Sequence, residues 1–114
     1  MVDLELCAPN GATLRDAALI DSGADASAFP IHWLNRLEIR KKDCRRRTVA
    51  TACGPGVQWR YPERMRAKIL GHDVELEAVF VDAPVALLGR ADFMDYFVIT
   101  FDQRARRLRA RPYD

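Results

Sequence analysis

The chain has 114 residues, of which 49% are apolar and 30% charged, with 18 basic against 16 acidic side chains. This length fits one domain over residues 1–114, which can bury a core without a metal or disulfide. The apolar fraction argues against intrinsic disorder, and no apolar run approaches the roughly 20 residues of a membrane span. The acidic N-terminus is unlike a signal peptide. We therefore expect a cytoplasmic protein with no membrane partner.

The small net charge hides an uneven distribution of basic residues. Seven basic and two acidic residues lie between Arg36 and Arg47, and five arginines with no acid lie between Arg104 and Arg111. These two segments form either an electropositive surface for nucleic acid or an acidic partner, or ordinary solvated strand faces.

Cysteine and histidine are sparse. The cysteines are odd in number, no pair has metal-ligand spacing, and the two histidines are far apart. We expect free thiols in a reducing compartment, no zinc site and no cofactor. The residues concerned are Cys7, Cys44, Cys53, His32 and His72.

In chain order, the sequence predicts many short strands and two short helices. Alternation over 2–7, the Asn10-Gly11 dipeptide and an apolar stretch at 14–20 indicate a hairpin. A helix is expected from Pro30 to about Leu37, since proline suits a first helical turn. The other expected elements are strands 45–52 and 57–61 around Gly54-Pro55-Gly56, strands 65–70 and 74–81 around a turn at 71–73, a strand end at 87–89, a helix at 91–96, and strands 97–101 and 106–111. This pattern indicates a mostly β domain.

The segment with the clearest chemistry is Asp21-Ser22-Gly23, directly after the apolar pair Leu19-Ile20. A carboxylate at the end of a buried strand is costly to ionise unless another group pairs with it. The triplet by itself is also common in β-turns, so its setting has to distinguish a site from a turn.

Residues 18–25, Ala-Leu-Ile-Asp-Ser-Gly-Ala-Asp, resemble the catalytic loop of the retroviral-type (retropepsin-like) aspartic proteases and their single-domain cellular relatives. Residues 69–72, Ile-Leu-Gly-His, and residues 84–90, Pro-Val-Ala-Leu-Leu-Gly-Arg, resemble later segments of the same family in the same order. The resemblance spans roughly residues 14–101. It implies a mostly β, retropepsin-like half-barrel with a flap hairpin and one or two short helices, assembled as a homodimer.

The resemblance also implies a mechanism. Each protomer of a retropepsin supplies one catalytic aspartate, so two copies of Asp21 would meet at the dimer axis. Two adjacent carboxyl groups share one proton and titrate as a unit. The charged partner would act as the base on a shared water, and the protonated partner would hydrogen-bond the scissile carbonyl of a peptide or protein substrate. No metal is required.

The same resemblance implies roles for other site residues. Ser22 would hydrogen-bond across the dimer axis, and Gly23 would let the substrate backbone approach. Ala24, which offers no hydroxyl, implies activity from mildly acidic towards neutral pH. Asp25 would contact substrate and would form an ion pair with Arg90 behind the site, although two ordinary surface charges are the plain alternative.

The resemblance further implies the residues that surround the substrate. Gly54-Pro55-Gly56 would lie at the tip of the flap, which closes over the substrate. Apolar subsite walls imply a preference for apolar residues beside the cleaved bond, while core packing explains the same residues equally well. The remaining substrate-binding candidates are Leu19, Ala26, Cys53, Val85 and Leu87.

Three departures from the retroviral pattern stand out. The N-terminal interface strand is shortened, and the chain continues past Phe101 into a basic arm at 106–111. We expect this arm to build the dimer interface or to shield a sheet edge. Pro55 stiffens a flap that lacks the multi-glycine tip, and the run 45–47, Arg-Arg-Arg, has no retroviral counterpart.

One alternative function belongs to a different class. The chain could be a catalytically silent dimeric module of the same fold that binds a protein or nucleic-acid partner through its arginine-rich segments. Nucleic acid is not the partner we expect, because few aromatic residues accompany the basic runs. Those aromatic residues are Trp59, Tyr61 and Tyr113.

Overall fold

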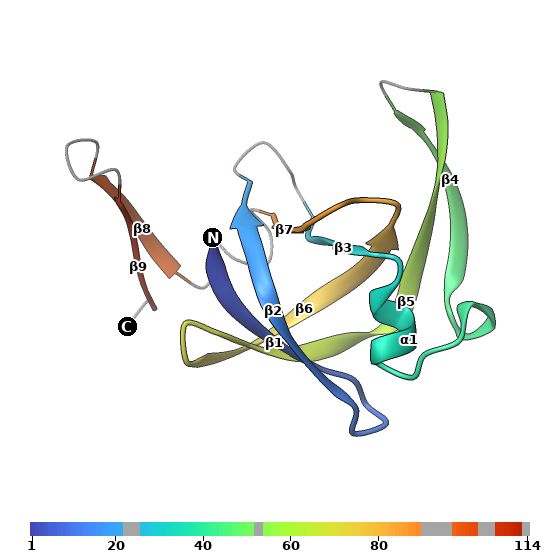
Figure 1. Ribbon diagram of the computed structural model, residues 1–114, viewed down its shortest axis with the longest axis horizontal. Coiled ribbons are helices and arrows are strands. Elements are labelled where there is room, and N and C mark those ends of the chain that lie inside the picture. Colours follow the sequence, from blue (N-terminus) through green and yellow to red (C-terminus); the bar gives the residue numbers. More distant parts are fainter. Residues whose placement is uncertain (22–25, 52–53, 90–96, 103–106, 113–114) are drawn as a thin grey trace.

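The computed structural model describes residues 1–21, 26–51, 54–89, 97–102 and 107–112. Strands dominate this part of the chain, with one short α-helix and one 3-10 turn (Figure 1). The predicted mostly β class is therefore confirmed. In chain order the elements are β1 (Val2–Cys7), β2 (Thr13–Ile20), β3 (Ala28–Pro30), α1 (Trp33–Arg36), η1 (Lys41–Asp43), β4 (Arg45–Thr51), β5 (Gly54–Ile69), β6 (His72–Val81), β7 (Ala86–Leu88), β8 (Phe97–Asp102) and β9 (Arg107–Pro112).

Six strands close into a barrel. The main sheet has the order β1-β2-β7-β3-β6-β5-β4, and β1 pairs with β5 as well as with β2. Leu6 of β1 lies opposite Leu14 on one side and Ala67 on the other. Within the described part of the chain, this closure leaves β4 as the one strand of the sheet that pairs on a single side.

The first hairpin forms as the sequence predicts. Leu4 and Leu6 alternate with more exposed residues and point into the barrel. The side-chain oxygen of Asn10 accepts a hydrogen bond from the backbone N–H of Ala12 at 2.8 Å. Gly11 has φ of 92°, which glycine adopts without steric cost. Local turn chemistry and burial thus specify the same hairpin.

The barrel is filled from β5, β6 and the segment after β2. Met65, Ala67 and Ile69 of β5 are buried, whereas the residues between them are exposed. The Phe29 ring lies 5.9 Å from the ring of Phe80 at the centre of this core. Burial of these side chains supplies the main favourable term for folding.

A helix lies within the expected range 30–37, as α1, but it begins three residues later than predicted. Pro30 is the last residue of β3 and lies in register with Val81 of β6. The backbone N–H of Ile31 then donates to the carbonyl oxygen of Val81 at 2.8 Å, which continues the pairing. The helix begins only at Trp33, whose ring stacks on Phe29 at 5.5 Å. Tertiary burial of the segment outweighs the preference of proline for a first helical turn.

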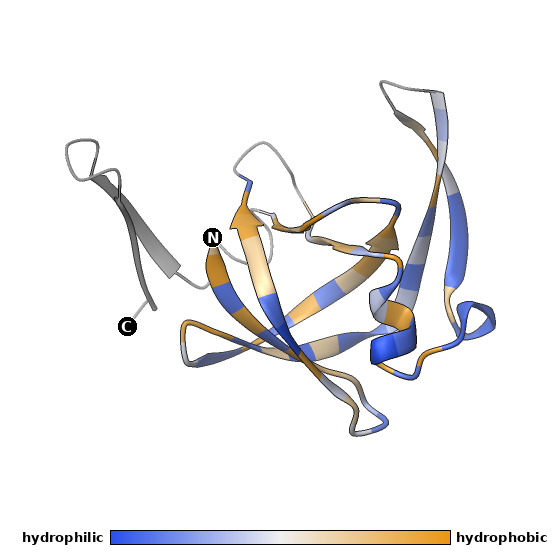
Figure 2. Cartoon of the chain, in the orientation of Figure 1, coloured by the Kyte–Doolittle hydropathy of each residue, from blue (hydrophilic) through white to orange (hydrophobic). Residues whose placement is uncertain are grey.

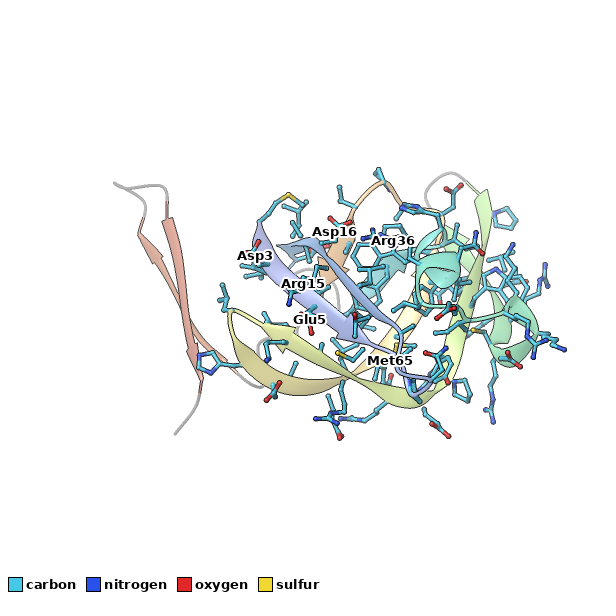
Figure 3. All side chains as sticks on the ribbon, turned by 60° about the horizontal axis from the view of Figure 1, so that its bottom comes forward. Asp3, Glu5, Arg15, Asp16, Arg36 and Met65 are labelled. Carbon is cyan, nitrogen blue, oxygen red and sulfur yellow. The ribbon has the colours of Figure 1, made fainter. Side chains whose placement is uncertain are left out.

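The outer face of the barrel is charged. Arg15 and Glu5 form an ion pair at 2.7 Å, and Arg36 of α1 reaches Asp16 of β2 at 2.9 Å (Figure 3). The backbone N–H of Ala17, followed by the Arg36 guanidinium, holds the pKa of Asp16 below its usual value. These exposed contacts join β2 to β1 and to α1, and they contribute little stability.

The β4–β5 hairpin, called the flap hairpin below, extends away from the barrel (Figure 1). The sequence predicted two strands at 57–61 and 65–70, but β5 is a single strand of 16 residues. Its register with β6 shifts between Arg60 and Arg64. Pro62 lies in this interval and has no N–H to offer the ladder. Trp59 and Arg60 still pair with β6 beyond it, so the hairpin leaves the barrel only past Trp59.

Two turn positions differ from expectation. Gly54-Pro55-Gly56, predicted at the flap tip, already belongs to β5 and pairs with residues 49–51. The turn expected at 71–73 is the two-residue turn Leu70-Gly71, because His72 already pairs with Ile69. Both turn residues have positive φ, 51° and 81°, as tight hairpin turns require.

The strands β8 and β9 form a separate two-stranded antiparallel sheet. This hairpin stands apart from the barrel at the end of the chain (Figure 1). It confirms the predicted strands near 97–101 and 106–111. The helix expected at 91–96 lies outside the described residues. In the described part of the chain, no helix is long and apolar enough to cross a membrane.

Candidate active site

The ends of two parallel strands position Asp21. Leu19 and Ile20 of β2 lie in parallel register with Leu87 and Leu88 of β7. The backbone N–H of Asp21 then donates to the carbonyl oxygen of Leu88 at 3.0 Å. Asp21 is half-buried. Its main chain is therefore held by the barrel at the point where β2 ends.

Gly89 makes a close backbone approach beside this point. It is buried, and a Cβ atom on it would lie 2.5 Å from the carbonyl carbon and oxygen of Ala26 and 2.9 Å from its nitrogen. Distances below 3.0 Å to backbone atoms cannot be relieved by turning a side chain. The chain entering β3 and the chain leaving β7 thus fit together only with glycine at 89.

Ser27 joins the segment before β3 to the segment after β7 through a hydrogen bond. The sequence did not identify this residue. Its side chain is fully buried, and its Oγ accepts a hydrogen bond from the backbone N–H of Gly89 at 3.1 Å. Buried polar groups need such partners. The available signal was a lone hydroxyl residue within the apolar stretch 26–30, Ala-Ser-Ala-Phe-Pro.

We expect Ser27→Ala to lower the free energy of unfolding by about 1–3 kcal/mol, because it leaves the buried N–H of Gly89 without its acceptor. Urea unfolding at fixed protein concentration measures this difference. Ser27→Thr keeps the hydroxyl oxygen and is expected to lose less. Equal losses in the two variants would show that packing of the site, rather than the hydrogen bond, explains the effect.

The apolar subsite candidates lie on β2, on or before β7, and in the segment before β3. Leu19 is 40% exposed although it is a large apolar side chain, and its register partner Leu87 is half-buried. Val85 is also half-buried and Ala26 is exposed. The end of β2 is correspondingly apolar in Figure 2. An exposed leucine beside a half-buried carboxyl group is a surface that an apolar side chain of a ligand could cover.

The predicted flap residues lie on the β4–β5 hairpin, away from Asp21 of the same chain. Gly54 and Pro55 line a hollow of about 370 Å³ on the flap hairpin, together with Thr48, Val49 and Ala50. In Figure 1 the outer end of this hairpin is well separated from the end of β2. A larger hollow of about 680 Å³ runs along β1 and contains none of the predicted site residues. The structure therefore does not bring Gly54, Pro55 and Gly56 to Asp21.

Several predicted site residues lie outside the described residues, and their roles stay predictions. They are Ser22, Gly23, Ala24, Asp25, Cys53 and Arg90. Among the residues described, no three His, Cys, Asp or Glu side chains gather closely enough to hold a metal ion. Cys7 and Cys44 are free thiols, and burial raises the pKa of each above its usual value. Both thiols therefore stay protonated at neutral pH.

Comparison with solved structures identifies the fold. The chain superposes on the simian foamy virus (mac) protease with a TM-score of 0.54 and 25% identity, covering 80% of this chain and 88% of that one. The EIAV protease, solved with a bound inhibitor, gives a TM-score of 0.51 and 23% identity, covering 79% and 81%. A foamy viral protease-reverse transcriptase gives a TM-score of 0.54 at 18% identity, over all of this chain and 13% of that longer one. No protein-family model and no curated protein sequence matches the chain.

The chain therefore has the retropepsin-like fold that its motifs indicated. The closed six-stranded barrel and the predominance of strands are the features described above that match that fold. Asp21 stands where β2 ends against β7, which makes it the centre of the candidate site.

Proposed function

We propose that the protein is an aspartic endopeptidase that acts as a homodimer, with one Asp21 from each protomer at a shared active site. The observation that carries this proposal is the main chain of Asp21, which the Leu88 carbonyl holds at the junction of β2 and β7. The retropepsin-like fold supports the same assignment. A single half-buried carboxyl group cannot be both acid and base, so the chemistry requires a second copy.

In the proposed mechanism, the two Asp21 carboxyl groups share one proton, because two adjacent carboxylates cannot both ionise at low cost. The ionised group takes a proton from water as the water oxygen bonds to the scissile carbonyl carbon, while the protonated group donates to the carbonyl oxygen. The C–N bond then breaks, the amine nitrogen takes up a proton, and the carbonyl re-forms. The enzyme forms no covalent intermediate.

The proposed substrate is an extended polypeptide with apolar side chains beside the cleaved bond. Leu19 and its register partner Leu87 offer apolar surface close to the end of β2, and half-buried Val85 lies directly before β7. In the proposed dimer the flap hairpin closes over the peptide and excludes water from the reacting carbonyl. Its apolar outer end, at Val49, Ala50 and Pro55, suits that role.

We further propose that the β8–β9 hairpin builds the dimer interface. A two-stranded hairpin without a packing partner is marginally stable in water, and its unpaired edges are templates for further strands. Within the described residues, β8 and β9 pair only with each other. A second copy of this hairpin would supply the missing strands and bring the two protomers together.

A dilution series measured with a mixed peptide library tests this proposal. Cleavage per chain is expected to rise with protein concentration in step with the dimer fraction from analytical ultracentrifugation. Deletion of 103–114 removes β9 and is expected to abolish both dimer and cleavage, while the thermal transition of the barrel remains. A fully dimeric wild-type chain without cleavage would refute the peptidase; an unchanged dimer after the deletion would refute this interface alone.

A further inference from the structure

The flap hairpin carries a set of basic residues that the rest of the sheet does not balance. Arg45, Arg46 and Arg47 begin β4, and all three are exposed. Their register partners on β5 are Arg60, Trp59 and Gln58. None of the three arginines forms an ion pair with any residue that the structure describes.

The other half of β5 shows the opposite arrangement. Three basic residues there lie in register with three acidic residues of β6, so each positive charge faces a negative one. Like charges directly opposite each other destabilise a sheet, whereas opposite charges stabilise it. Arg60, the register partner of Arg45, is itself in an ion pair with Glu77 at 2.9 Å, so the positive charges left without a described acidic partner are those of Arg45, Arg46 and Arg47. The pairs in register are Arg64 with Glu77, Arg66 with Glu75, and Lys68 with Asp73.

The uncompensated arginines lie along an open strand edge. β4 is the last strand of the main sheet and pairs only with β5 among the described strands. Its other edge leaves main-chain N–H and C=O groups that an extended chain can pair with. In Figure 2 the first part of β4 and the neighbouring 3-10 turn are strongly hydrophilic. Lys41 and Lys42 of that turn add to the positive charge.

We propose that the edge of β4 at 45–47 is a docking site for an extended, acidic stretch of a polypeptide. The stretch adds to the sheet as a strand next to β4, and its carboxylates pair with the three arginines. This site lies on the flap hairpin and uses neither Asp21 nor the residues around it. The inference therefore does not depend on peptidase activity.

The same surface fits single-stranded nucleic acid less well. Binding of bases needs exposed aromatic rings on which they can stack. Trp59, the aromatic residue opposite Arg46, is half-buried, and the ammonium group of Lys41 lies over its ring at 5.4 Å. Phosphate oxygens can accept from main-chain N–H groups but offer no donor to the C=O groups of a sheet edge, whereas a polypeptide strand pairs with both.

Fluorescence anisotropy with the full chain and a labelled peptide of three consecutive Glu residues flanked by Thr tests this site. Successive side chains of a strand point to opposite faces, so consecutive Glu residues are needed to reach all three arginines. The peptide lacks the apolar residues of the proposed substrate, so cleavage does not interfere. Substitution of Arg45, Arg46 and Arg47 by Gln is expected to weaken binding roughly tenfold to a hundredfold, since each exposed ion pair contributes modestly. The matched control replaces Arg64, Arg66 and Lys68 by Gln, which removes the same charge, and is expected to bind within about twofold of wild type.

A second peptide separates strand addition from charge alone. N-methylation of alternate residues keeps every carboxylate but removes main-chain donors, so it is expected to reduce binding about tenfold. Failure of the acidic peptide to bind, or equal losses in the two triple variants, would overturn the proposal. So would tighter binding of an unstructured RNA oligonucleotide that depends on Arg45, Arg46 and Arg47, or an unchanged affinity for the N-methylated peptide.

Discussion

Asp21→Asn is expected to reduce peptide cleavage by at least about a thousandfold while the dimer and the fold remain intact. The amide has nearly the shape of the carboxyl group, and the hydrogen bond to Leu88 comes from the main chain, so the position of residue 21 is kept. An amide can neither take a proton from water nor share one with its counterpart. Loss of general acid and base together removes the largest catalytic contribution available to this site.

Asp16→Asn is the matched control, because it removes one carboxylate from the same strand on the outer face of the barrel. It disrupts the exposed ion pair with Arg36 and is expected to leave cleavage within about twofold of wild type. Initial rates on the mixed peptide library at a dimer-saturating concentration compare the variants. Unchanged cleavage by Asp21→Asn would remove Asp21 from the mechanism.

Gly89→Ala is expected to lower the free energy of unfolding by about 3 kcal/mol, a large part of the roughly 5–15 kcal/mol of a typical domain. The added Cβ would lie 2.5 Å from two backbone atoms of Ala26. Because the contact is with main chain, the strand end or the segment entering β3 has to shift. That shift also disturbs the hydrogen bond from Gly89 to Ser27.

Urea unfolding at fixed concentration measures this loss, with Gly71→Ala as the control. Gly71 has open space around it, and its φ of 81° makes alanine strained there by only about 1 kcal/mol. We expect Gly89→Ala to lose clearly more stability than Gly71→Ala. A smaller loss at Gly89 than at Gly71 would contradict the close approach of the two segments.

Short sequence patterns correctly predicted the elements whose conformation depends mainly on neighbouring residues. The first hairpin follows from alternation over 2–7 and the Asn10-Gly11 turn, which agree with each other. The predicted helix begins at Trp33 and not at Pro30, because pairing of Phe29 and Pro30 with β6 keeps the start of that segment extended. The continuity of β5 was missed because Pro62 looks like a strand end when its pairing partner is unknown.

The candidate site likewise has one part that the sequence predicted and one part that it did not. A contiguous motif identified Asp21, and the apolar run before it predicted the strand end that the structure contains. The contact between Ser27 and Gly89 joins residues 62 positions apart and exists only because β7 inserts between β2 and β3. Neither residue type nor spacing reveals such a contact before the topology is known.

The central claim is that one chain holds half an active site, and mixing wild-type chains with Asp21→Asn chains tests it most directly. The two proteins are combined at constant total concentration and allowed to exchange protomers, and cleavage is measured against the wild-type fraction. If each site needs two copies of Asp21, mixed dimers are inactive and activity falls with the square of that fraction. Activity that falls in simple proportion would show that a single chain carries a complete site and would contradict the claim.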